Sequence, residues 1–205
     1  GYVYSQEEII NIANLAKKND LFIVVDEVYR EFIYTDTKHF SILEDEKFSE
    51  NAILIDSTSK RYSLCGARVG FIVSKNSEFI ETCLKFALTR LSPPTLGLIA
   101  ANHALNSRED YIENVIKEYY KRREVIINEL SQIDNIKFSN PMGAFYSIIK
   151  LPIENAEDFA KFLLTDFSYK NQSVMLSPAS GFYSSENYGK DAVSYTHLRA
   201  HETPL

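Results

Sequence analysis

The sequence LFIVVDEVY at residues 21–29 is the stretch that decides the fold. Its first five residues form an unbroken apolar run, which is typical of a strand covered on both faces, and the run ends at the acidic Asp26. Two further runs of this kind follow along the chain, AILI at residues 52–55 and GFIV at residues 70–73. Because such strands belong to sheets with helices on both sides, the pattern predicts the α/β class with a largely parallel sheet.

Helical patterns occupy the segments around these runs. Residues 5–8 read SQEE, which is a capping box, so a helix is expected to begin there. From about residue 77 to residue 130 the apolar spacing is helical. Beyond it the pattern predicts a smaller α+β unit, with strands at residues 136–138, 144–149 and 173–176 and a helix at residues 155–166. We therefore predict that residues 1–108 belong to a large domain and residues 109–191 to a long connecting helix and a small C-terminal domain.

The composition limits the classes of protein to which the chain can belong. The 205 residues carry 22 Lys+Arg and 28 Asp+Glu, and the net charge of −6 argues against a nucleic acid or an anionic membrane as the main partner. An apolar fraction of 45% fits a packed globular domain, and no run approaches the roughly 20 apolar residues of a membrane span. Two cysteines cannot form a disulfide framework and no basic-then-apolar leader opens the chain, so a cytoplasmic location is expected.

Polar segments follow the first two apolar runs. Asp26 lies at the carboxyl end of its strand, where open α/β sheets bind ligands, although a helix N-cap is the alternative interpretation. Residues 56–70 read DSTSKRYSLCGARVG, in which three hydroxyl side chains precede Lys60 and Arg68 stands between glycines. These donors suit a phosphate group, and the alternative is a polar surface loop whose cations are only solvated. Neither segment decides between its two interpretations alone.

Five segments in order resemble the class I/II aminotransferases, which are fold-type I pyridoxal-phosphate enzymes. The resemblance extends to about Asp191, and the chain begins at the last residue of the family's Asn-Pro-Thr-Gly segment, so we expect a C-terminal fragment that lacks roughly half of a family member. The matching segments are GYVYS at residues 1–5, DEVY at 26–29, STSK with GARVG at 57–70, PMGAFY at 141–146 and SPASGFY at 177–183.

The resemblance implies a role for three residues around the cofactor ring. Lys60 would form a Schiff base with pyridoxal 5′-phosphate and later move a proton, which suits an amine whose pKa falls readily in a desolvated, cationic site. Asp26 would bind the pyridine nitrogen and keep it protonated, so that the ring withdraws electrons. Tyr29 would donate a hydrogen bond to the phenolic oxygen of the ring.

The resemblance also implies a phosphate site and an activity. Arg68 would bind the phosphate, with hydroxyl groups from Ser57 and Ser59. The expected function of the whole protein is transfer of an amino group between an amino acid and a 2-oxo acid, by a homodimer without bound metal. Two alternatives stay open at this point: a lyase or decarboxylase of the same fold, and an aminotransferase-like effector domain of a transcriptional regulator.

The tail from residue 192 departs from the family. Family members continue into a Glu-Val-Arg-Ile-like strand whose arginine pairs with the substrate carboxylate. Here the chain instead reads AVSYTHLRAHETPL, which resembles a translated transposase-type sequencing adapter. We therefore interpret residues 192–205 as adapter-derived and expect them to pack poorly from about Val193 onward. Arg199 is not assigned to substrate, because the expected arginine position is residue 194.

Overall fold

The computed structural model describes residues 1–106, 109–186 and 188–196 of the chain. The described residues form two compact units, one of residues 3–116 and one of residues 1–2 with 117–196. The division falls within helix α5 (Glu109–Leu130), after the boundary expected at residue 108. The limits of the two domains stay a prediction.

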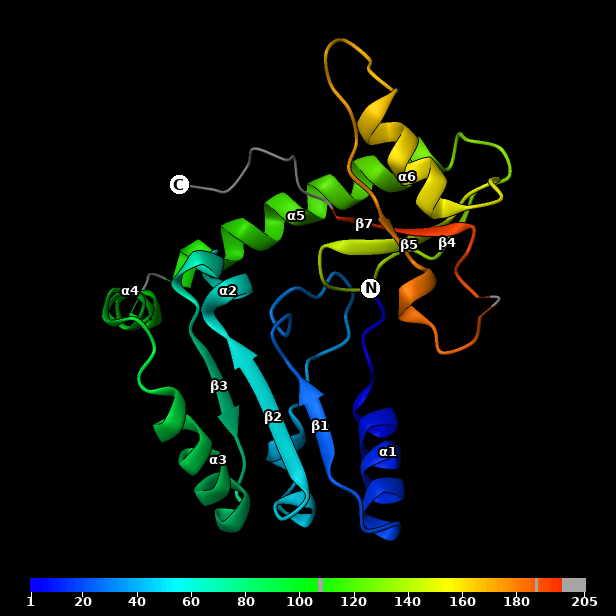
Figure 1. The fold of residues 1–205 in the computed structure, drawn as a ribbon. Helices are drawn as coiled ribbons and strands as arrows, with labels where there is room; N and C mark the ends of the chain where they lie inside the picture. The colour runs from blue at the N-terminus through cyan, green and yellow to red at the C-terminus, as the bar shows by residue number, and fades with distance from the viewer. Residues whose placement is uncertain (107–108, 187, 197–205) are drawn as a thin grey trace. The chain divides into compact units, whose positions relative to one another are not determined.

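The first unit contains a three-stranded sheet with the order β1-β2-β3, shown in Figure 1. Strand β1 (Ile23–Asp26) pairs in parallel with β2 (Ala52–Ser57), whereas β3 (Gly70–Val73) runs antiparallel to β2. The predicted parallel pairing therefore holds for β1 and β2 only. Antiparallel β3 brings its amino end, and not its carboxyl end, to the edge where β1 and β2 finish.

The helices of the first unit begin largely where the sequence predicts. In α1, Ser5 Oγ accepts a hydrogen bond from Glu8 N and the Glu8 carboxylate accepts one from Ser5 N, which completes the expected capping box. The apolar face of α1 joins a buried cluster around Phe48 and Ala52. The helical elements of this unit are α1 (Gln6–Lys18), η1 (Ile42–Glu44), η2 (Glu46–Phe48), α2 (Thr58–Arg61), η3 (Cys65–Ala67), α3 (Ser77–Arg90) and α4 (Thr95–Leu105).

Burial of the sheet differs from the expectation of strands covered on both faces. Central β2 is buried over most of its length, whereas all four residues of β3 are exposed. In β1, Val24 is 62% exposed, and Ile72 in β3 is 51% exposed. The described residues therefore leave part of β1 and β3 uncovered, although their apolar side chains are typical of strands that are covered on both faces.

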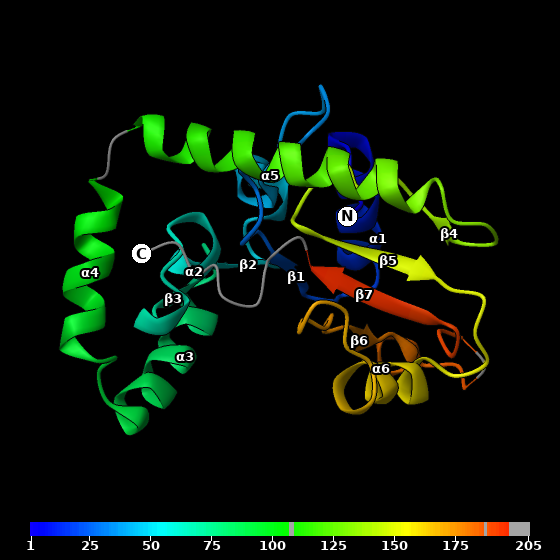
Figure 2. The ribbon, with the colours of Figure 1, turned by 90° about the horizontal axis from the view of Figure 1, so that it is seen from above.

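The second unit is built on a four-stranded sheet with the order β4-β5-β7-β6, visible in Figure 2. Neighbouring strands in this sheet are antiparallel. The strand predicted at residues 173–176 is wrong, because β6 lies at residues 177–178, the two residues that pair with β7. The elements of this unit besides α5 are β4 (Lys137–Phe138), β5 (Tyr146–Lys150), α6 (Ala156–Thr165), β6 (Ser177–Pro178), η4 (Ser180–Phe182) and β7 (Ala192–Thr196).

The expectation that the chain packs poorly from Val193 onward is wrong for residues 193–196. These residues belong to β7, which lies between β5 and β6, and Val193 is 1% exposed. Val193 and Tyr195 are apolar at alternate positions, so both reach the core around Ile149, while β5 offers an edge that needs a partner. Leu198 and Arg199 lie outside the described residues, and the adapter origin of the tail stays a prediction.

No helix among the described residues is both long enough and apolar enough to span a membrane.

The uncovered apolar strands predict that the 205-residue chain self-associates when it is expressed alone. Replacing Val24 and Ile72 together by threonine keeps β-branched side chains but removes exposed apolar surface, so the apparent mass should fall toward 23.5 kDa. Light scattering after size-exclusion chromatography measures this change. A matched Val24→Ile/Ile72→Val variant keeps the apolar surface and should remain associated, and equal masses for the two double variants would contradict the prediction.

Candidate functional site

The pairing of β1 with β2 places Asp26 and Ser57 on one face of the sheet. Asp26 is opposite Ile55, and side chains of opposed residues lie on the same face, as do those two positions apart in a strand. Asp26 is the last residue of β1 and Ser57 the last of β2. Asp26 is exposed, and its Oδ1 accepts a hydrogen bond from Val28 N at 3.1 Å. A turn rather than a helix follows Asp26, so the alternative of a helix N-cap does not apply.

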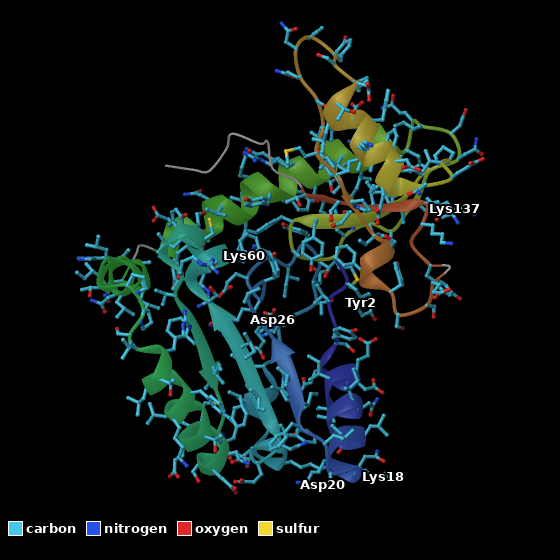
Figure 3. The ribbon with its side chains drawn as sticks, in the orientation of Figure 1. Tyr2, Lys18, Asp20, Asp26, Lys60 and Lys137 are labelled. Carbon is cyan, nitrogen blue, oxygen red and sulfur yellow. The ribbon has the colours of Figure 1, made fainter. Side chains whose placement is uncertain are left out.

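Lys60 lies beside Tyr29 at this same end of the sheet. Lys60 belongs to α2, the single turn that directly follows β2, and its Nζ is 5.5 Å from the centroid of the Tyr29 ring. Tyr29 is half-buried, and burial together with the negative charge of Asp26 raises the pKa of its hydroxyl. Figure 3 shows Lys60 and Asp26 at the ends of neighbouring strands. An amine, a phenol and a carboxylate from two segments therefore gather at one edge.

The hydroxyl groups of residues 57–59 are held by the backbone that leads into β3. Ser57 Oγ donates to the carbonyl oxygen of Val69 at 2.9 Å, and Thr58 Oγ1 donates to the same oxygen at 3.2 Å. Ser57 Oγ also accepts a hydrogen bond from Ser59 N and lies 2.8 Å from Ser59 Oγ. Ser57 thus caps α2 while it ties the loop around Arg68 to the end of β2.

Arg68 stands in an unusual backbone conformation. Its φ of 56° and ψ of 42° lie in the left-handed region, which is costly for a residue with a Cβ. The exposed side chain donates from Nη1 to the carbonyl oxygen of Cys65 at 3.0 Å. Helix α4 packs on this turn so closely that a Cβ at Gly97 would lie 2.3 Å from the carbonyl oxygen of Ala67. The fold therefore fixes the backbone of Arg68 firmly.

A buried carboxylate that the sequence analysis did not select supports the segment of Asp26 and Tyr29. Glu27 is 3% exposed and accepts hydrogen bonds from Ser41 Oγ and the backbone of Ile42, and it pairs with His39 Nε2 at 2.9 Å. Burial opposes ionisation of Glu27, but the hydrogen bonds from His39 and Ser41 outweigh it, so its pKa is lowered overall. The sequence signal was an acid next to Asp26 directly after an apolar strand.

The sequence analysis also did not select a group of four charged side chains around Asp56. Arg61 and Arg30 both contact Asp56, and both contact Glu31. Asp56 is on the face of the sheet opposite to Ser57, because the two are consecutive in β2. The available signal was the acidic Asp56 at the end of the apolar run 52–55, but Arg30 and Glu31 lie on a different segment of the chain. We refer to Arg30, Glu31, Asp56 and Arg61 as the Arg61 cluster.

The donor set suits a phosphorylated carbonyl cofactor. An amine next to a phenol can react with an aldehyde, an exposed carboxylate can hold a cationic ring nitrogen, and hydroxyl groups with a guanidinium can bind phosphate. Lys60, Tyr29 and Asp26 provide the first set, and Arg68 lies on the loop that Ser57 ties to β2. Among the described residues, no group of three or more His, Cys, Asp or Glu side chains is placed to hold a metal ion.

This arrangement defines an α/β unit that can hold a phosphorylated, carbonyl-bearing cofactor at the ends of its strands. The family model for aminotransferase class I and II matches residues 1–187, and the chain belongs to this family. Family members depend on pyridoxal phosphate, and the α/β fold of a fold-type I aminotransferase, with a partial large domain, is confirmed.

Individual relatives cover the chain almost completely. An aspartate aminotransferase of Bacillus sp. (strain YM-2) is 34% identical in an alignment of 191 residues that covers 89% of this chain and 47% of that protein. A (5-formylfuran-3-yl)methyl phosphate transaminase of Methanocaldococcus jannaschii is 32% identical in an alignment of 193 residues that covers 93% of this chain and 49% of that protein. The crystal structure of an aromatic aminotransferase from Pyrococcus horikoshii OT3 gives a TM-score of 0.83 at 28% identity and covers 98% of this chain and 52% of its own. The chain spans about half the length of the curated relatives it matches.

The left-handed backbone at Arg68 predicts that glycine and alanine at this position differ in stability, whereas both substitutions weaken phosphate binding. Arg68→Gly removes the conformational penalty of a Cβ, whereas Arg68→Ala keeps it, so the glycine variant should be the more stable by about 1 kcal/mol. Both variants should bind inorganic phosphate more weakly than the parent chain. Denaturant unfolding and calorimetric titration measure the two effects, and a glycine variant less stable than the alanine variant would contradict the strain.

Proposed function

We propose that the protein containing this chain is a pyridoxal-phosphate-dependent aminotransferase that moves an amino group between an amino acid and a 2-oxo acid. The observation that carries the proposal is the position of Lys60 beside Tyr29, at the edge where Asp26 and Ser57 end parallel strands. Membership of the aminotransferase family supports this reaction over the lyase, decarboxylase and regulator alternatives.

Three side chains act on the ring end of the cofactor. Bound pyridoxal phosphate supplies an aldehyde and an electron-withdrawing ring. The Lys60 amine would react with the aldehyde and would take up and return the substrate proton at Nζ. The Asp26 carboxylate would hold a proton on the ring nitrogen, because a negative charge favours the cationic form. The Tyr29 hydroxyl, whose pKa is raised by burial and by the charge of Asp26, would donate a hydrogen bond to the ring oxygen.

Two segments form the phosphate end. Arg68 supplies the charged donor, and Ser57 and Ser59 supply hydroxyl groups at the start of α2. In the present arrangement the Arg68 guanidinium bonds the carbonyl oxygen of Cys65. Phosphate binding exchanges this neutral acceptor for an anion, which is the stronger partner for a guanidinium.

The finer properties of the protein follow from the same proposal. Amino acids and 2-oxo acids are its substrates, with aspartate as the first donor to test, since several relatives are named aspartate aminotransferases. From the family resemblance we propose that the full-length protein is a cytoplasmic homodimer, and the acidic composition argues against a nucleic-acid or anionic-membrane partner.

Removing the reactive amine provides the central test. In the full-length protein, Lys60→Ala should abolish the covalent adduct with pyridoxal phosphate and lower transamination by about 10²-fold or more. Borohydride reduction followed by peptide mass mapping locates the adduct. Lys18→Ala, at an exposed lysine near the end of α1, is the matched control and should retain it. An adduct that persists in Lys60→Ala assigns the chemistry to another residue.

We further propose that residue 194 is the position at which the protein would bind the carboxylate of its substrate. Ser194 pairs with Ile148 and Ser177 in β7, and residue 194 is the position where the resemblance to the family leads us to expect an arginine. Serine cannot form the bidentate ion pair that a guanidinium makes with a carboxylate. We therefore place the substrate-binding position at residue 194 and infer that the native codon there encodes arginine.

Restoring this arginine should improve substrate binding and leave the cofactor in place. In a full-length protein that retains Ser194, Ser194→Arg should lower KM for the amino acid by about 10-fold or more, because a charge-assisted pair contributes about 2 kcal/mol or more. Steady-state kinetics with aspartate measures KM, and Ser194→Gln, which is long but uncharged, is the control. An equal gain in the two variants, or a genomic serine codon at this position, would refute the assignment.

A further inference from the structure

The Arg61 cluster joins the two segments that carry the proposed cofactor residues. Arg61 Nη2 donates a hydrogen bond to Asp56 Oδ2 at 3.1 Å, and Arg61 Nε lies 2.6 Å from Glu31 Oε1 in an ion pair without hydrogen-bond geometry. Arg30 completes the cluster, with Nη2 at 3.0 Å from Asp56 Oδ2 and Nε at 3.2 Å from Glu31 Oε1. Two arginines and two acids therefore balance in charge, and each acid contacts both arginines.

The side chains of the Arg61 cluster are largely buried, so the strength of its ion pairs depends on their geometry. The side chains of Arg61 and Asp56 are 10% and 11% exposed, and that of Glu31 is 22% exposed. Burial opposes the charge of Arg61, but Glu31 and Asp56 more than compensate, so the pKa of its guanidinium is raised. Ion pairs at this depth are screened less by salt than exposed ones, and their contacts depend on the planar fork of arginine.

Helix α2 needs such an anchor. It consists of four residues, and a single helical turn is unstable in water without tertiary contacts. Its start is fixed by Ser57, whose Oγ accepts from Ser59 N, and its last residue is Arg61. Lys60 stands between these two fixed points, one position before Arg61. The direction in which Lys60 leaves the helix is thus determined at both ends.

The Arg61 cluster also connects helix α2 to the segment that carries Tyr29. Glu31 follows Tyr29 by two residues, and Asp56 precedes Ser57, whose backbone N donates to Asp56 Oδ1 at 2.8 Å. Asp56 is on the face opposite to Ser57 and Asp26, so the cluster holds the strand ends from behind the site. The contact of Lys60 Nζ with the Tyr29 ring spans the same two segments.

We propose that Arg61 is a positioning residue for Lys60, which through Asp56 and Glu31 sets the approach of the lysine amine to the cofactor aldehyde. Arg61 itself touches neither the cofactor nor the substrate in this role. The inference rests on the proposed function of Lys60, and its consequence is that loss of the Arg61 fork slows the reaction of Lys60 with pyridoxal phosphate in a protein that is still folded.

The test measures the rate at which Lys60 is trapped. The full-length protein is mixed with pyridoxal phosphate and quenched with borohydride, which reduces the C=N bond formed as water leaves, and the labelled Lys60 peptide is quantified over time. Arg61→Lys keeps the charge but cannot contact both acids through a fork, so trapping should slow by about 10-fold or more, the scale expected when a reactive group is misplaced. The absorbance band of the Lys60 adduct should shift as well.

A second variant separates positioning from folding. Glu31→Gln/Arg61→Met removes one charge of each sign and leaves Asp56 paired with Arg30, so an unpaired buried charge is avoided. It should unfold at a temperature close to that of the parent and still trap Lys60 about 10-fold more slowly or worse. Glu118→Gln/Arg122→Met removes an exposed Arg–Glu pair on α5 and is the matched control, with an unchanged rate.

The outcomes distinguish this inference from the proposed function. A folded Arg61→Lys or double variant that traps Lys60 at the parental rate overturns the positioning role. Failure of both variants to fold assigns the cluster to stability alone and overturns it equally. If the parent protein forms its adduct at a residue other than Lys60, the proposed function itself fails, whatever the Arg61 variants do.

Discussion

The parallel pairing of β1 with β2 is the interaction on which the site depends. It brings two strand ends to one edge, and its register, with Asp26 opposite Ile55, puts Asp26 on the same face as Ser57. A shift of one residue would send one of these side chains to the other face. Tyr29 follows β1 and Lys60 follows β2. Because the two strands end side by side, Lys60 Nζ lies 5.5 Å from the centroid of the Tyr29 ring.

The two faces of this sheet carry different polar side chains at the edge where β1 and β2 end. One face presents Asp26 and Ser57, while the other carries Asp56, whose carboxylate gathers two arginines. The Asp56 carboxylate on the second face is paired with both arginines, and these contacts restrain short segments that have little internal stability. Rigid support behind a reactive side chain is what a positioned site requires, because chemistry is sensitive to small misplacements.

The C-terminal strand illustrates how a sheet accepts a sequence that satisfies its alternation. Strand β7 places Val193 in the core and fills the gap between β5 and β6. Any segment with apolar side chains at alternate positions and free backbone groups can pair in this way. Pairing therefore fixes the position of residue 194 in the sheet without requiring the side chain that the family uses there.

The sequence by itself determined most of the elements and the order of the segments that carry the candidate site, but it misplaced β6 and missed β7. The apolar runs, the capping box of α1 and the hydroxyl-rich loop before Lys60 depend on spacing within a few residues, which local physics reads directly. Only the tertiary structure decided the antiparallel direction of β3, the left-handed turn at Arg68 and the pairing of Arg61 with Asp56 and Glu31. Those features arise from contacts between segments distant in the chain, where register and packing select among partners that the sequence leaves equivalent.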